Sequence, residues 1–128
     1  MASKQSMKWL LLSLDGRVTR STWWFFWVVS MAAFSGSLVV DFMVGTFDME
    51  SGFGLINLAV SLLLFWPWLA VNVKRLHDRD RSGWFLLLLI VPLVNLWIMI
   101  ELAFLAGTAG DNRFGEDRRA APGVPAAA

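Results

Sequence analysis

The sequence contains no cysteine, no tyrosine and a single histidine among its 128 residues. The lack of cysteine excludes a disulfide framework, a thiol nucleophile and a thiolate metal site. Charged residues are also scarce, at 16% of the chain, against about 25% in ordinary soluble domains. The 11 Lys and Arg nearly balance the 10 Asp and Glu, and the net charge of +1 gives no reason to expect nucleic-acid binding.

Apolar residues, by contrast, make up 57% of the chain, and the mean hydropathy is +0.59. An ordinary soluble domain is about 45–50% apolar, and a domain this small leaves much of its surface in water. The apolar surplus therefore excludes a soluble protein. It also excludes a disordered chain, because disordered chains are poor in apolar residues.

Three long apolar stretches, at residues 22–44, 53–73 and 84–106, hold this surplus. Each reaches the roughly 20 residues that a helix needs to cross about 30 Å of hydrocarbon. Asp41 in the first stretch and Glu101 in the third are the only charged residues in them. We therefore predict an all-α integral membrane bundle of three transmembrane helices.

The third stretch is interrupted near its middle by Pro92 and Asn95. Proline removes a helix donor and frees the carbonyl four residues earlier, so this stretch is either a kinked span or a re-entrant hairpin. Each arm of a hairpin has about 11 residues, or about 16 Å of helix, which is too short to cross the membrane. We therefore expect the kinked span. The hairpin is the alternative, and it returns the carboxyl terminus to the cytoplasm.

Basic residues gather in two segments, one before the first predicted helix and one between the second and the third. The loop between the first and second helices (GTFDMESG) has only acidic charges. By the positive-inside rule the amino terminus is cytoplasmic, and a count of three spans places the carboxyl terminus outside. The predicted organisation is a cytoplasmic amino-terminal segment (1–21), a membrane domain (22–106), and a polar motif with a flexible tail (107–128).

Tryptophan is unusually frequent, with eight residues in the chain. Six of them lie near the predicted cytoplasmic boundary: Trp9, Trp23, Trp24, Trp27, Trp68 and Trp84. Indole partitions to the headgroup level of a bilayer, so we interpret these rings as an aromatic belt that fixes depth and tilt. The alternative, a Trp-lined pocket for a quinone, haem or aromatic ligand, lacks support because the single histidine has no usual second axial ligand except Met. We expect no cofactor.

Three polar segments carry most of the available chemistry: residues 14–24 (LDGRVTRSTWW), 74–84 (KRLHDRDRSGW) and 107–115 (GTAGDNRFG). Their order and spacing resemble the domain of unknown function 805 family, small bacterial inner-membrane proteins with G-R-x-x-R, R-R-L-H-D-x-x-x-S-G-W-W and G-T-x-G-x-N-R-[FY]-G elements. The resemblance covers residues 12–117, with departures at Lys74, Asp80 and Phe85. It implies a bacterial inner-membrane location and no established activity.

These segments supply the candidate binding residues. Arg17 and Arg20 precede the first helix at headgroup level, where Arg can bond a lipid phosphate in bidentate fashion. The other candidates for lipid or partner binding are Lys74, Arg75, His77, Asp78, Arg81, Trp84, Asn112 and Arg113. The simpler interpretation is a positive-inside signal, with long side chains that reach the interface.

His77 beside Asp78 does not predict a metal site, because a site needs several convergent ligands and the chain has no second His or Cys. We expect Asp78 to pair with a basic group such as Arg17 or Arg20, and His77 to bond backbone or a carboxylate. If residues 107–115 also face the cytoplasm, the three polar segments form one cap over the bundle.

The intramembrane acids Asp41 and Glu101 are functional candidates, because a charge within a spanning helix costs a few kcal/mol. In a three-span bundle both acids lie in the outer half of the bilayer with Asn57, and two close carboxyls there could share a proton or cation. This arrangement gives an alternative function, a small oligomeric proton-coupled transporter in which Glu101 titrates. The simpler interpretation is a protonated Glu101 that hydrogen-bonds a neighbouring helix, with Asp41 reaching water.

We predict no enzyme activity, since no G-x-S-x-G, H-E-x-x-H or P-loop spacing occurs. The predicted function is a binding module in the inner membrane. Its Arg-rich, Trp-flanked cytoplasmic face would bind anionic lipids or a membrane-protein partner, including a second copy of the chain.

Overall fold

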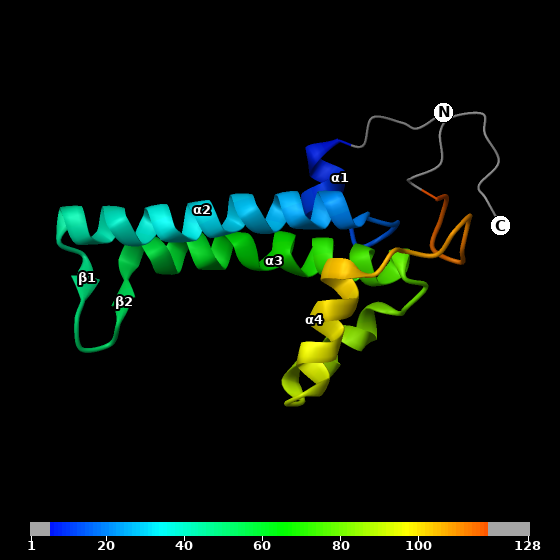
Figure 1. Cartoon of the computed structure of the whole chain (residues 1–128). Helices are drawn as coiled ribbons and strands as arrows, with labels where there is room; N and C mark the ends of the chain where they lie inside the picture. The colour runs from blue at the N-terminus through cyan, green and yellow to red at the C-terminus, as the bar shows by residue number, and fades with distance from the viewer. Residues whose placement is uncertain (1–5, 118–128) are drawn as a thin grey trace.

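Two long helices that lie side by side dominate the computed structural model, which describes residues 6–117 (Figure 1). The elements in chain order are α1 (Met7–Leu12), α2 (Arg20–Val44), β1 (Phe47–Asp48), β2 (Phe53–Gly54), α3 (Leu55–Asp78), the 3-10 helix η1 (Gly83–Ile90) and α4 (Val94–Phe104). Residues 1–5 and 118–128 belong to the predicted amino-terminal segment and tail, and they lie outside the described residues.

Helices α2 and α3 match the first two predicted helices, at residues 22–44 and 53–73. They have 25 and 24 residues, which is about 36–38 Å of helix. Both are apolar and long enough to cross a bilayer, and only 11% and 28% of their most apolar windows are buried inside the protein. Apolar side chains left outward over this length suit lipid rather than water. The fold is therefore mostly helical and fits an all-α membrane protein.

A tight turn joins the two long helices at the end away from both polar loops. Helix α2 ends at Gly45, whose φ of +80° lets its N–H bond the carbonyl of Asp41. In the turn between β1 and β2, the Ser51 hydroxyl and the backbone N–H groups of Glu50 and Ser51 donate to Asp48. These bonds lower the pKa of the Asp48 carboxyl, so this end of the molecule keeps its negative charge.

The third apolar stretch, residues 84–106, is not the kinked single helix that we expected. It consists of η1 and α4, separated by a turn in which Pro92 lacks an N–H and Leu93 adopts a φ of +69°. Figure 1 shows that α4 returns toward α3 and runs across the direction of the long pair. Because this segment turns back instead of running on as one helix, the structure has a helical hairpin in place of a third span.

Both ends of this hairpin lie against the last turns of α3. Gly83 packs on Val73 at the start, and at the finish the carbonyls of Leu102 and Leu105 accept hydrogen bonds from Arg75. Residues 107–117 therefore lie at the same end of the long helices as residues 14–20. In the structure the carboxyl-terminal motif lies beside the amino-terminal segment, as the hairpin alternative predicts, and not at the far end of the long pair, where three crossings would put it.

Candidate functional site

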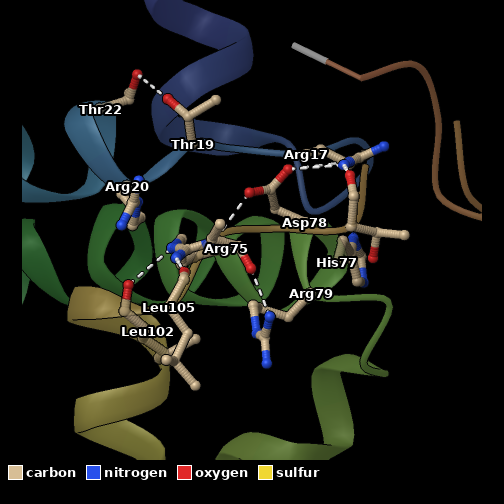
Figure 2. Close-up of polar contacts among 12 residues, drawn as sticks. Arg17, Thr19, Arg20, Thr22, Arg75, His77, Asp78, Arg79, Leu102 and Leu105 are labelled. Carbon is tan, nitrogen blue, oxygen red and sulfur yellow. Dashed lines mark hydrogen bonds and ion pairs between the residues drawn. The ribbon is translucent and has the colours of Figure 1, made fainter. Parts of the chain in front are cut away.

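The centre of the site is a buried ion cluster around Asp78, at the last residue of α3. Arg17 Nε donates to Asp78 Oδ1 at 3.0 Å, and Arg75 Nη1 donates to Asp78 Oδ2 at 2.8 Å (Figure 2). All three side chains are fully buried. Arg75 and Asp78 share one face of α3 because they are three residues apart. The predicted pairing of Asp78 with a basic group of the first motif is confirmed, and Arg17 is that group.

One carboxylate cannot satisfy two guanidinium groups, and backbone carbonyls take the remaining donors of Arg17. Its Nη2 donates to the carbonyl of Thr108 at 2.7 Å, and its Nη1 donates to that of Gly110 at 2.8 Å. Gly107 lies so close that a Cβ there would fall 2.0 Å from Asp78 Oδ2. Arg17 thus ties the third polar motif to the first two.

His77 completes the connection between the motifs. We expected His77 to bond backbone or a carboxylate, and its partner is backbone: Nδ1 forms a 2.9 Å hydrogen bond with the carbonyl of Gly16. Its ring stacks on Phe114 at 3.9 Å between centroids, and Asn112 Nδ2 donates to the His77 carbonyl. Residues 14–24, 74–84 and 107–115 therefore meet in one assembly, which we call the polar cap.

The polar cap also covers the carboxyl end of α4. A helix leaves its last four carbonyls without internal partners, and they carry partial negative charge. Here five consecutive carbonyls each accept a side-chain N–H: Leu102 from Arg75 Nε, Ala103 from Trp24 Nε1, Phe104 from Arg20 Nη1, Leu105 from Arg75 Nη2 and Ala106 from Arg79 Nη1. Arg20, Arg75 and Arg79 are therefore engaged in capping this helix.

Glu101 belongs to the polar cap and is not a partner of Asp41. Its Oε1 accepts from Arg81 Nε at 3.1 Å and from Arg79 Nε at 3.3 Å, and the carboxyl group is buried. Asp41 binds other partners at the far end of the long helices, so the predicted pair of close carboxyls does not form. That expectation rested on a single long third helix, and the η1–α4 hairpin takes its place.

Asp41 lies at the opposite end of the long pair, and it is buried instead of reaching water. Its carboxylate accepts the backbone N–H groups of Ile56 at 2.9 Å and Asn57 at 2.7 Å, and also the hydroxyl of Thr46. These N–H groups belong to the first turn of α3, where the N-cap residue Gly54 has no side chain to bond them. Asp41 therefore caps α3.

Burial divides the predicted binding residues into two groups. Four of them are fully buried and bonded within the protein: Arg17, Lys74, Arg75 and Asp78. His77 is nearly buried. The others reach the surface to differing degrees, with Trp84 78% exposed, the Arg113 and Arg81 side chains 62% and 42% exposed, Arg20 exposed and Asn112 half-buried. Only this second group is open to a headgroup or partner.

A groove runs between α2 and α4 beneath the exposed residue Arg20. Its volume is about 570 Å³, and its walls are apolar, with Trp24, Val28, Ile100 and Phe104 among the lining residues. A smaller hollow at its mouth is lined by Arg20, Ser21, Trp24, Ala103 and Phe104. The sequence did not predict this groove, because a single spanning third helix would not lie across α2.

Two further residues of the cap escaped prediction. Asn72 accepts a 3.0 Å hydrogen bond from Trp23 Nε1, which joins α2 to α3 just below the ion cluster. A polar side chain in an apolar run is the signal that could have found it. Arg79 lies in the predicted basic loop, and it was not included among the candidates. Within residues 6–117, no group of three or more His, Asp or Glu could hold a metal ion.

Comparisons with known proteins agree with the resemblance of the three motifs. The family described as protein of unknown function (DUF805) matches residues 11–116. Inner membrane protein YhaH of Escherichia coli strain K12 is 37% identical over 107 residues, covering 84% of this chain and 88% of YhaH. Inner membrane protein YhaI of the same strain is 31% identical over 119 residues, covering 87% and 95%. No solved structure gives a significant match to this chain.

Proposed function

This chain belongs to the DUF805 family, and on that premise we propose that it is a non-enzymatic inner-membrane protein that binds anionic phospholipid at the rim of its polar cap. The cap faces the cytoplasm in this proposal. The distribution of charge supports that side: the cap carries seven of the 11 Arg and Lys residues, while the turn between α2 and α3 carries Asp48 and Glu50 and no basic residue.

The observation that carries the proposal is the groove between α2 and α4. It combines an exposed guanidinium at its mouth, that of Arg20, with an apolar interior of about 570 Å³. Arg20 uses Nη1 on the carbonyl of Phe104, and a guanidinium has further donors for a phosphate. A lipid headgroup at Arg20 with an acyl chain between Trp24 and Ile100 matches this combination of charge and apolar surface.

Burial narrows the original hypothesis to fewer residues. The interior cations are bonded to carboxylates and carbonyls, so the groups open to lipid lie on the exposed rim: Arg20, Arg81, Trp84 and Arg113. Of these, Arg20 lines the mouth of the groove. Exposed tryptophan at this level is typical of the membrane interface. A protein partner or a second copy of the chain is the alternative occupant of this rim.

The transporter hypothesis loses its main support. It needed Asp41 and Glu101 to lie near each other, and each has a different set of partners at opposite ends of α2 and α3. No described contact favours it over the binding module.

The test is lipid retention in native mass spectrometry of the full chain, with phosphatidylglycerol against phosphatidylcholine. We expect the native chain to retain phosphatidylglycerol preferentially. Arg20→Gln should lower that retention about three- to fivefold, the effect of one exposed charge. The matched control is Arg113→Gln, which removes an exposed charge away from the groove and should change it less than about twofold.

Two results would contradict this proposal. Equal retention of the two lipids by the native chain would exclude an anionic headgroup site. Equal losses in Arg20→Gln and Arg113→Gln would mean that binding is spread over the rim and that the groove is not its seat.

A further inference from the structure

A second groove lies between the two long helices, in the part of the molecule that the polar cap does not reach. Its volume is about 240 Å³, and the lining residues include the rings of Trp27, Phe34, Phe65 and Trp68. Two hydroxyls, of Ser30 and Ser61, also line it. Charged side chains are not among its lining residues.

The groove lies deep relative to the cap. On α2 it extends from Trp27 to Phe34, which are 7 and 14 residues beyond Arg20. At 1.5 Å per residue these positions are about 10 and 21 Å along the helix axis from Arg20. With Arg20 at headgroup level, the groove is therefore within the hydrocarbon layer.

Two hydrogen-bond donors in this groove are unused. Among the described residues, Trp27 Nε1 and Ser30 Oγ are buried atoms with no hydrogen-bond partner. Comparable groups nearby are satisfied: Ser61 Oγ donates to the Asn57 carbonyl at 2.8 Å, and Trp23 Nε1 donates to Asn72. A buried donor without a partner costs free energy, and the cost is greatest where no water can enter. The pair therefore points to an acceptor that a ligand supplies.

The walls define what kind of acceptor fits. An uncharged groove has nothing to hold a headgroup, and this depth is below the level at which phospholipids carry their polar groups. Flat aromatic walls favour a planar ring, since rings pair in stacked or edge-to-face arrangements. The acceptor must then be a carbonyl oxygen on a planar, lipid-soluble molecule.

The sequence alone did not support a Trp-lined quinone pocket, but the unpaired donors in this groove do. We propose that the groove binds the ring of a lipid-soluble quinone, with one ring carbonyl accepting hydrogen bonds from Ser30 Oγ and Trp27 Nε1. The aliphatic tail of the quinone extends into the bilayer along the open side of the groove. This proposal concerns binding only. Trp27 lines both grooves, so the two sites are told apart by Ser30, which lines the α2–α3 groove and is not among the residues of the α2–α4 groove.

The experiment follows the indole N–H signal of Trp27 in ¹H–¹⁵N spectra of the full chain in detergent micelles. Loss of one signal in Trp27→Phe assigns it among the eight tryptophans. Titration with decyl-benzoquinone should move this signal downfield and reach saturation, because the N–H gains an acceptor. Decylbenzene has the same tail and no carbonyl, and it should produce no saturable downfield shift.

A pair of serine variants supplies the matched control. Ser30→Ala removes one donor and should raise the Kd for decyl-benzoquinone about three- to tenfold. Ser35→Ala removes an exposed hydroxyl from the same helix and should change the Kd less than about twofold.

Three outcomes would overturn the proposal. The first is an unchanged Trp27 signal or an equal shift with decylbenzene. The second is a saturable shift with phospholipid alone, which would assign the acceptor to a lipid ester. The third is a dimer that Ser30→Ala dissociates, which would assign the groove to a second copy of the chain. Arg20→Gln should leave the quinone shift unchanged, so the two proposals fail separately.

Discussion

The two ends of the α2–α3 pair are built on the same two residue types but use them differently. At each end a fully buried aspartate lies under a glycine, Asp41 under Gly54 and Asp78 under Gly107, and a Cβ on either glycine would fall 2.0 Å from a carboxylate oxygen. At the turn, Asp41 binds two backbone N–H groups and a hydroxyl. At the cap, Asp78 binds two guanidinium groups.

Sequence distance explains the difference. The partners of Asp41 lie within 16 residues of it, so this end closes locally as soon as α2 and α3 meet. Arg17 is 61 residues from Asp78, and it also reaches Gly110, which is 93 residues away in the chain. Segments far apart in the chain have no local turn that fixes their register, and at this end ion pairs hold them together. Asp41, which caps a helix, and Asp78, which joins segments far apart in the chain, should therefore respond differently to the same substitution.

The largest expected effect concerns sidedness, since the comparison requires Asp78 and residues 107–117 to lie on one side of the membrane. The chain has no cysteine, so single variants Asp15→Cys, Glu50→Cys and Glu116→Cys can each be labelled uniquely. With a membrane-impermeant maleimide on intact cells, we expect Glu50→Cys to label and the other two to be protected until the membrane is opened. Labelling of Glu116→Cys together with Glu50→Cys would restore a three-span topology.

The next effect is on stability, and it compares the two acids directly. Asp78→Asn leaves Arg17 and Arg75 buried with no counter-charge, and should lower the free energy of unfolding by about 3–5 kcal/mol. Asp41→Asn keeps the shape of a cap and loses only its charge, for about 1–2 kcal/mol. Unfolding in SDS followed by far-UV circular dichroism measures both. Equal losses of unfolding free energy in Asp78→Asn and Asp41→Asn would show that the two acids do not differ in this way.

The smallest effects come from the two glycines. In Gly107→Ala the new Cβ would also fall 2.7 Å from the backbone carbonyl of Asp78, whereas in Gly54→Ala its three nearest atoms all belong to the Asp41 side chain. Both should cost about 1–3 kcal/mol, with Gly107→Ala the more costly because backbone moves less readily than a side chain. Gly36→Ala is the control, since nothing lies within 4 Å of its Cβ. The same unfolding assay ranks the three, and a larger loss in Gly54→Ala would reverse the expected order.

Sequence patterns predicted the parts of the fold that depend on local chemistry. Apolar length located α2 and α3, and the expected pairing of Asp78 with a basic group of the first motif anticipated the Arg17 contact of the ion cluster but not the Arg75 contact. The third segment could not be predicted in the same way. Arms of about 11 residues are too short to cross a bilayer, but nothing in residues 84–106 requires this segment to cross.

What decides the path of this segment lies far away in the chain. The carbonyls of Phe104 and Leu105 are satisfied by Arg20 and Arg75, and no pattern within residues 84–106 records those bonds. Glu101 was predicted at the wrong end of the molecule for the same reason. Its partners Arg79 and Arg81 lie beside it only because the chain turns back.

The capping of α4 by side chains from elsewhere sets an order of assembly. Arg20 and Trp24 on α2 and Arg75 on α3 must already be in place before the last carbonyls of α4 find donors. During synthesis the amino-terminal part of a chain folds first. The docked position of the η1–α4 hairpin therefore depends on the α2–α3 pair, and we expect the hairpin to dock after that pair has formed.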